Sequence, residues 1–168
     1  MQHPSIPESK KSQANASAMN EYDAAAIRTI ISTMQQAWNA KDGRLFSSVF
    51  DDEHDYIVLN GLYFPGMTRQ ANAKAHQDLF KGIYIEEDVE MRIDRIRSIR
   101  KNLVQVTAFS SRYQKNASLP ENPNSIMTIL VEKKNHEWKI ISFHNHGLDS
   151  SVHQGPLPMK LMYAGWYR

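Results

Sequence analysis

The sequence predicts an α+β domain in which three N-terminal helices precede a large antiparallel sheet. Two observations support this fold class. Up to about residue 82, apolar residues recur mostly at helical spacing, interrupted by one hairpin pattern. From Val89 onward, apolar and polar residues alternate in runs separated by turn residues, which is typical of strands. Helices that precede such a sheet are expected to pack on one of its faces.

The first helix is predicted from about Asp23 to Ala40. Its apolar stripe consists of Ile27, Ile30, Ile31, Met34, Ala37 and Trp38. Asn20 or Asp23 can cap its start, and the segment "KDG" after Ala40 ends it. A short second helix is expected over "RLFSSVF", closed by the acidic "DDEHD". The aspartates at these boundaries are expected to serve as turn or cap residues: Asp42, Asp51 and Asp52.

The segment "DYIVLNGLYFPG" predicts a β-hairpin. Asn60-Gly61 is the preferred pair for a tight turn whose two central residues both have positive φ, and the flanking residues are β-branched or aromatic. Pro65-Gly66 is expected to end the second arm. Thr68 can cap a third helix over "RQANAKAHQDLFK", and Gly82 would end that helix.

The strands of the large sheet are predicted over "VEMRIDRIRSI", "LVQVTAFSSRY", "SIMTILVEK" and "WKIISFHNH". Short turns at "RKN" and "KNHE" and a Pro- and Asn-rich loop, "QKNASLPENPN", connect them. Strands joined in this order form an antiparallel meander.

Three segments are predicted along the chain. Residues 1–20 are rich in Pro, Ser, Lys, Asn and Ala and are expected to form a disordered tail. Residues 21–148 form the α+β domain. Residues 149–168 are expected to dock on their own domain or on a partner subunit, because a disordered tail rarely holds so many large apolar groups. These groups are Met159, Leu161, Met162, Tyr163, Trp166 and Tyr167.

Composition excludes several classes of function. The chain has no cysteine, so disulfides, thiolate zinc sites and cysteine nucleophiles are excluded. The net charge of +2 does not indicate nucleic acid, and the basic run "RIDRIRSIRK" fits one solvated face of a strand. No apolar run approaches the roughly 20 residues of a membrane helix. The N-terminus lacks the apolar core of a secretory signal, so a cytoplasmic protein without a membrane partner is expected.

Three stretches, with the strand spacing between them, resemble a known family: "IISTMQQAWNAKDGRLFSSVFDDEHDYIVLNG", "FPGMTRQANAKAHQDLF" and "SIMTILVEKKNHEWKIISFHNH". They are similar to the nuclear transport factor 2-like superfamily and, within it, to SnoaL-like proteins of the SgcJ/EcaC type. The resemblance implies a cystatin-like fold, in which a curved sheet wraps around the helices as a cone with a pocket at its wide end. It also implies a homodimer formed sheet to sheet.

The family resemblance does not imply one reaction, since its members include isomerases, dehydratases, cyclases, hydrolases and association domains. Ketosteroid isomerases carry a catalytic aspartate before the third helix. The corresponding segment here, "YIVLNGLYFPG", has no carboxylate beyond the preceding Asp55, which speaks against that chemistry.

The tripeptide His144-Asn145-His146 admits three interpretations: a pair of metal ligands, an acid–base pair in the pocket, or the end of a strand. If the strand alternates regularly, both histidines share a face with Trp138, and Asn145 lies on the other face. A metal site needs a third ligand. The candidates are His76, Asp55 and Glu137, which nothing in the sequence brings close. We therefore assign neither a metal nor a cofactor.

The candidate catalytic residues are His144, His146 and His76, because imidazole titrates near neutral pH. The simpler interpretation of His76 is a half-buried helix residue. Trp38 and Tyr56 could equally be core residues. The candidate ligand-binding residues are Trp38, Tyr56, Asn60, Leu62, Phe109, Met127 and Asn145.

The sequence thus predicts a domain that binds a small apolar molecule in the cone. It leaves open whether the domain also catalyses a cofactor-independent acid–base reaction of the isomerase, dehydratase, cyclase or hydrolase type. The alternative is a non-catalytic dimerisation or protein-association module.

Overall fold

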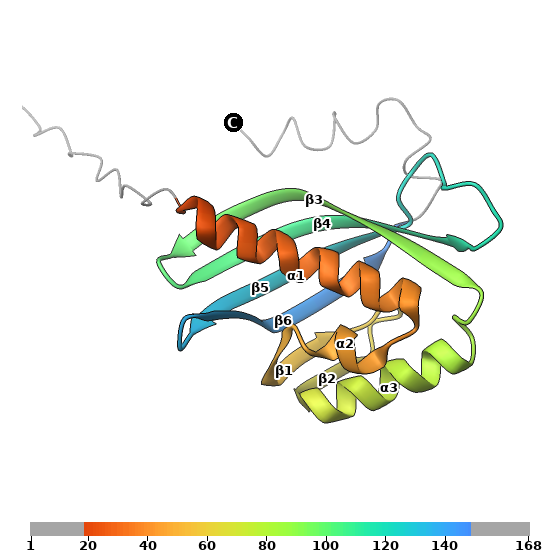
Figure 1. Cartoon of the computed structure of the whole chain (residues 1–168), viewed down its shortest axis with the longest axis horizontal. Coiled ribbons are helices and arrows are strands. Elements are labelled where there is room, and N and C mark those ends of the chain that lie inside the picture. Colours follow the sequence, from red (N-terminus) through yellow and green to blue (C-terminus); the bar gives the residue numbers. More distant parts are fainter. Residues whose placement is uncertain (1–18, 149–168) are drawn as a thin grey trace, which may run out of the picture.

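The computed structural model describes residues 19–148. The elements are, in order, α1 (Glu21–Ala40), α2 (Gly43–Ser47), β1 (Phe50–Ile57), β2 (Tyr63–Thr68), α3 (Arg69–Lys81), β3 (Glu87–Arg100), β4 (Leu103–Gln114), β5 (Ser125–Lys134) and β6 (Glu137–Gly147). Figure 1 shows α1 lying across one face of a curved sheet, with α2 and α3 beside β1 and β2. The predicted α+β class is confirmed. The N-terminal tail, apart from its last two residues, and the C-terminal extension lie outside the described residues.

The caps predicted for the helices are confirmed, and they explain where each helix begins. The Asn20 side chain accepts a hydrogen bond from the backbone N–H of Asp23 at 2.8 Å. The Thr68 hydroxyl accepts from the Ala71 N–H at 3.1 Å, and Asp42 caps α2 through the Leu45 N–H at 2.8 Å. These bonds satisfy N–H groups that have no partner within a helix.

The second helix ends at Ser47, earlier than expected, because Ser48 and Val49 form a turn and Phe50 already belongs to β1. Phe50 is fully buried and pairs with Ile140 of β6, and the acidic segment after it is part of β1 rather than a helix end. Gly43 starts α2 where it touches α3. A Cβ atom there would lie 2.4 Å from the Ala73 carbonyl oxygen, so only glycine permits this close approach.

The strand order in the sheet is β2-β1-β6-β5-β4-β3. Every neighbouring pair is antiparallel except β1 and β6, which are parallel. The antiparallel meander predicted for the later strands, β3 to β6, is confirmed. The predicted hairpin strands extend the same sheet, and the long connection through β2, α3 and the meander lets β6 run parallel to β1.

The predicted two-residue turn at Asn60-Gly61 is wrong. The loop between β1 and β2 is longer, and only Gly61 has a positive φ, of 82°. The Gly61 N–H donates to the Val58 carbonyl at 2.8 Å. The expected geometry occurs instead between β5 and β6, where Asn135 and His136 have φ values of 49° and 68°.

Pro65 and Gly66 lie inside β2 instead of ending it. The sheet tolerates them because β2 is its edge strand, where a missing backbone N–H leaves no neighbour unpaired. Gly66 has a φ of 58°, and its N–H donates to the Asp55 carboxylate at 3.1 Å.

A β-bulge in β6 decides which of its residues face inward. Ser142 pairs with Leu130, but Ile140 pairs with Val131, so Ile141 is an extra residue in the strand. Trp138 and Ile140 are buried before the bulge, whereas Phe143 is buried after it. The expected regular alternation is therefore wrong. Asn145 follows Phe143 on the inner face, and the exposed His144 and His146 lie on the outer face.

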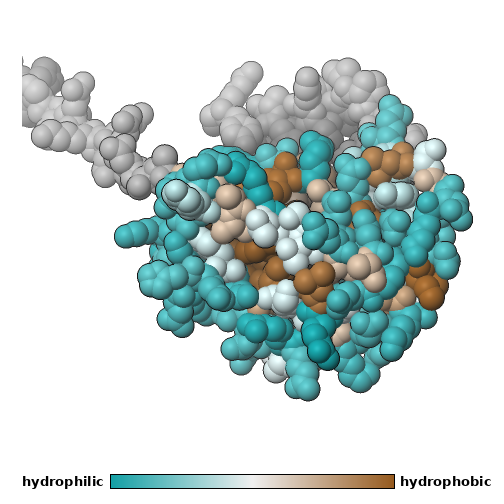
Figure 2. Space-filling view, viewed as in Figure 1, coloured by the Kyte–Doolittle hydropathy of each residue, from teal (hydrophilic) through white to brown (hydrophobic). Residues whose placement is uncertain are grey.

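The core lies between α1 and the inner face of the sheet. Its largest fully buried side chains are Phe46, Phe50, Phe80, Ile27, Met34, Met127, Ile129 and Ile140. Figure 2 shows that the side of the molecule seen from α1 is mostly hydrophilic, with apolar residues visible in its middle. Among residues 19–148, no helix has the length and apolar character needed to cross a membrane.

Candidate functional site

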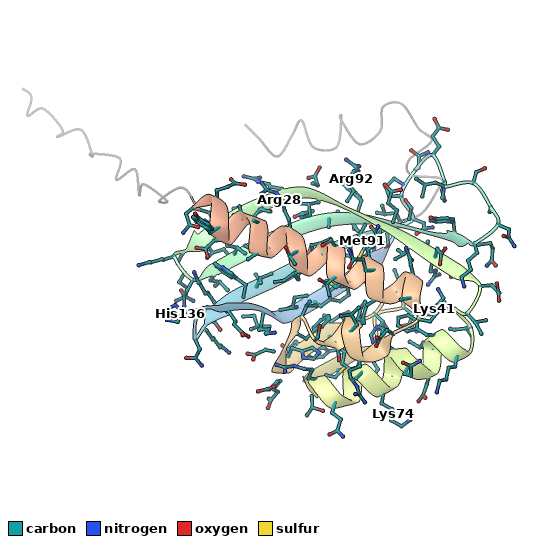
Figure 3. All side chains as sticks on the ribbon, in the orientation of Figure 1. Arg28, Lys41, Lys74, Met91, Arg92 and His136 are labelled. Carbon is teal, nitrogen blue, oxygen red and sulfur yellow. The ribbon has the colours of Figure 1, made fainter. Side chains whose placement is uncertain are left out.

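The strands and α1 together enclose a cavity at one end of the core, which we call the cavity end. It has an outer part of about 250 Å³ and an inner part of about 40 Å³. Five residues line both parts: Trp38, Tyr56, Leu59, Arg112 and Asn145. They come from the last turn of α1, from β1 and the loop after it, and from the ends of β4 and β6. The opposite end, with the turn at His136, is the turn end (Figure 3).

The structure brings six of the ten predicted site residues to this cavity: Trp38, Tyr56, Asn60, His76, Met127 and Asn145. The other four are placed elsewhere. Leu62 is 56% exposed in the loop between β1 and β2, and Phe109, His144 and His146 lie on the outer face of the sheet. The bulge at Ile141 is the reason for the position of the two histidines.

A buried hydrogen-bond chain runs from the cavity wall into the space under α3. The Tyr56 hydroxyl lies 3.2 Å from His76 Nε2, and His76 Nδ1 lies 3.1 Å from the Asn72 carbonyl oxygen. A carbonyl oxygen can only accept, so Nδ1 carries the proton of neutral His76. His76 Nε2 then accepts the hydrogen bond that the Tyr56 O–H donates.

The chain continues from Asn72 to His54. The Asn72 side-chain amide donates to His54 Nε2 at 2.8 Å, and His54 Nδ1–H donates to the Asp51 carbonyl at 3.1 Å. Asn72 and His54 are both buried, and the Asn72 Oδ1 has no hydrogen-bond partner within residues 19–148. Both histidines therefore need to be neutral for this network to be satisfied.

Burial sets the protonation states of these groups. It lowers the pKa of His76 to about 4, although the hydrogen bond to Asn72 acts in the opposite direction. It also lowers the pKa of His54 and raises the pKa of Tyr56 well above its ordinary value. At neutral pH the site thus holds an uncharged phenol that donates to an uncharged imidazole. Such a pair can orient a ligand group and can relay a proton.

Two buried polar atoms of the cavity residues have no hydrogen-bond partner within residues 19–148. They are Trp38 Nε1, which is a donor, and Asn145 Oδ1, which is an acceptor. The Trp38 ring itself is held by aromatic neighbours, with its centroid 5.2 Å from that of Phe80 and 5.0 Å from that of Tyr84. Its orientation is therefore fixed by packing, and its N–H is left free.

Sequence reasoning missed two further polar features of the cavity. Ser110 and Ser125 are buried in the wall of the inner part, and their hydroxyls share a hydrogen bond. Arg112 lines both parts. The signal was present in β4, where the inward positions run Val104, Val106, Ala108, Ser110 and Arg112. The apolar face of this strand becomes polar toward the cavity.

No group of three or more His, Asp or Glu side chains suited to a metal ion occurs within residues 19–148. The rings of His144 and His146 are 6.3 Å apart and have no third ligand in the described chain.

No protein-family model and no curated protein matches this sequence. Solved structures do match it. A domain of unknown function with a cystatin-like fold from Nostoc punctiforme is 21% identical, with 89% of this chain and 90% of that chain covered and a TM-score of 0.73. An NTF2-like protein with a cystatin-like fold from Novosphingobium aromaticivorans is 14% identical, with coverages of 79% and 86% and a TM-score of 0.63.

A ketosteroid isomerase-like protein from Erwinia carotovora atroseptica is 12% identical, with 77% of this chain and 99% of that chain covered and a TM-score of 0.60. These likenesses confirm that this chain has the fold of nuclear transport factor 2-like proteins. Proteins with this fold differ in function, so the function has to be argued from the cavity itself.

Proposed function

We propose that this protein binds a small, mostly apolar ligand in the cavity. One observation carries the proposal: Trp38 Nε1 and Asn145 Oδ1 are buried with no hydrogen-bond partner within residues 19–148, and both side chains line this cavity. A buried polar group without a partner costs about 1–3 kcal/mol. A ligand with an acceptor for Trp38 and a donor for Asn145, such as a ring alcohol, would remove both costs.

The walls of the cavity indicate the body of this ligand. Aromatic side chains surround the space: Trp38, Phe46, Tyr56, Tyr84 and Phe143. Typical pockets for drug-sized ligands measure about 300–1,000 Å³. The outer part, at about 250 Å³, lies just below that range. We therefore infer a ligand of one or two rings, stacked against aromatic side chains.

If the protein is an enzyme, Tyr56 and His76 are the groups that would move a proton. With a pKa of about 4, His76 is unprotonated at neutral pH but is a weak base. As such a weak base, His76 could accept a proton from a substrate that is already acidic, or it could hold the Tyr56 hydroxyl in place. It is less suited to removing a proton from an unactivated carbon. His144 and His146 do not enter this proposal, because their side chains lie on the outer face of the sheet.

The test compares Asn145→Leu with His144→Leu, neighbouring positions on opposite faces of β6. One- and two-ring alcohols, amides and ketones are titrated into ¹⁵N-labelled protein, and the indole N–H signals of the tryptophans are followed. Trp38→Phe assigns the Trp38 signal. We expect saturable shifts of the Trp38 signal and not of the Trp138 signal. Affinity should fall about tenfold in Asn145→Leu and stay unchanged in His144→Leu.

Two results would contradict the proposal. One is that no compound shifts the Trp38 signal, and the other is that the two variants bind equally well.

A second proposal concerns assembly, and the outer face of the sheet favours it. Phe109 and Ile126 are direct neighbours on β4 and β5 there, and Leu130 lies further along β5. Apolar groups gathered on an outer sheet face are typical of an interface. We infer a homodimer formed through this face. Sedimentation velocity should show a dimer that Ile126→Glu dissociates and that Lys74→Glu, on the exposed side of α3, leaves intact. A monomeric wild-type protein would exclude it.

A further inference from the structure

The cavity wall offers several N–H and O–H donors to a ligand, and one of them carries a positive charge. Trp38 Nε1–H has no partner within residues 19–148. The hydroxyls of Ser110 and Ser125 share one hydrogen bond, so one of their two O–H groups remains free to donate. Arg112 adds a guanidinium, a group that carries five N–H donors and no acceptor. Asn145 Oδ1 is a buried acceptor without a partner within residues 19–148, and the serine and tyrosine hydroxyl oxygens on the wall can also accept.

Arg112 is the only side chain charged at neutral pH among the described residues that line the cavity. Its backbone is fixed by Asn124, whose side chain accepts from the Arg112 N–H at 3.1 Å and donates to its carbonyl at 2.8 Å. Its guanidinium carbon lies 4.7 Å from the centre of the Tyr84 ring. Stacking on an aromatic ring holds the planar guanidinium in a defined orientation.

Glu87 balances the charge of Arg112 from the Nε side of the guanidinium. Glu87 Oε2 lies 2.8 Å from Arg112 Nε, so the two side chains form a close ion pair. The other carboxylate oxygen accepts from the Gln114 side chain at 3.3 Å. Within residues 19–148 this ion pair engages Nε alone, and the Nη1 and Nη2 groups of Arg112 are available to a ligand.

The second acidic group nearby is also paired. Asp88 Oδ1 lies 3.5 Å from Lys41 Nζ, which also donates to the backbone carbonyl of Glu87. Neither Glu87 nor Asp88 belongs to the cavity wall. An anion in the cavity would therefore meet the Nη groups of Arg112 and no uncompensated carboxylate.

We propose that the ligand is a ring acid, with an apolar body of one or two rings and a carboxylate that Arg112 binds. This inference rests on the proposed function and narrows its ligand class. A carboxylate matches the fork of an arginine in geometry and accepts several hydrogen bonds at once. It fits a wall that offers an arginine, an indole N–H and a serine O–H as donors. The ring body then lies against Trp38 and Tyr56, and Trp38 Nε1–H donates to an oxygen of the ligand.

The experiment compares two probes of nearly equal shape, 2-naphthoate and the neutral 2-naphthamide, by isothermal titration calorimetry. The wild-type protein is set against Arg112→Gln and Arg112→Lys. Arg92→Gln is the matched control, because Arg92 also lies over an aromatic ring, 5.6 Å from the centre of Phe109, but on the outer face of the sheet. Figure 3 labels Arg92 beside Met91, which lines the inner part of the cavity.

We expect 2-naphthoate to bind wild-type protein about tenfold more tightly than 2-naphthamide. Arg112→Gln should lower the affinity for 2-naphthoate but not for 2-naphthamide, and so remove this preference. Arg112→Lys keeps the positive charge and should retain part of the preference. Arg92→Gln should behave like the wild type. Equal binding of the two probes, or a preference that survives Arg112→Gln, would overturn the inference and leave the proposed function standing. Binding of neither probe, with no shift of the Trp38 indole signal by any ring compound, would overturn both.

Discussion

Trp138 and Trp38 lie at opposite ends of the same core, and their indole N–H groups have opposite surroundings. At the turn end, Trp138 Nε1 donates to the Asp23 carboxylate at 2.7 Å, and Lys133 pairs with the same oxygen at 2.7 Å. At the cavity end, Trp38 Nε1 is buried without a partner in the described chain. The indole N–H is thus satisfied within the protein at the turn end and unsatisfied at the cavity end. We interpret Trp138 as a structural residue, and the proposed ligand would contact Trp38.

Lowering the pH should destabilise the cavity end at a higher pH than the turn end. The pKa of His76 is about 4 when folded and about 6.5 when unfolded, so below pH 6.5 the unfolded chain binds a proton that the folded protein resists. The free energy of unfolding should be full above pH 6.5 and should fall by about 3 kcal/mol as the pH drops to 4. His54 acts in the same direction. Urea denaturation across this range measures the loss.

Substitutions at His76 and His144, and the carboxylate of Asp23, test this difference in pH dependence between the two ends. In His76→Gln the glutamine can still accept a hydrogen bond from Tyr56, and the fall in the free energy of unfolding between pH 6.5 and 4 should become smaller. His144→Gln, on the outer face, should leave this fall unchanged. The pKa of Asp23 is lowered by hydrogen bonds from Lys133 and Trp138, so its contribution is lost only as the pH falls below the ordinary range of a carboxyl group. A stability that stays constant between pH 6.5 and 4 would show that His76 is not held neutral.

The same truncation at the two tryptophans should give unequal results. Trp138→Phe removes a hydrogen bond to a carboxylate and should lower the free energy of unfolding by about 2 kcal/mol. Trp38→Phe removes an N–H that has no partner in the described part of the chain and should cost less, about 0.5 kcal/mol. Chemical denaturation at pH 7 measures both. Equal losses would mean that the Trp38 N–H is satisfied in solution.

Asn145→Leu should stabilise the protein while it weakens ligand binding. The change removes a buried acceptor without a partner and adds apolar surface to the wall beside Phe143, so the free energy of unfolding should rise by about 1 kcal/mol. Differential scanning calorimetry without ligand shows the sign. A decrease in the melting temperature would indicate that Asn145 has a structural partner.

Local features of the fold could be predicted from the sequence, whereas features set by distant strands could not. The caps at Asn20, Asp42 and Thr68 depend on residues within one turn, and they were found. The parallel pairing of β1 with β6 joins segments about ninety residues apart, and no local pattern records it. The turn at Asn135-His136 was placed correctly, but its left-handed residues follow from the strands that it joins.

The candidate site was predicted in part for the same reason. Trp38, Tyr56 and His76 followed from helix and strand patterns together with the family resemblance. Arg112 and Ser110 could have been found from the alternation in β4, which continues from its apolar inner face. The position of His144 and Asn145 could not, because it depends on where β6 gains a residue relative to β5, and this is a property of two strands together.

The extra residue at Ile141 also shifts the alternation of inward and outward side chains along β6 by one position. Deleting it would let the strand alternate strictly from Trp138 and would keep Phe143 and Asn145 on the inner face and His144 and His146 on the outer face. The codon of Ile141 can therefore be removed without changing which side chains of β6 line the cavity. Protein engineers could use this deletion to straighten β6 while the cavity wall stays as it is.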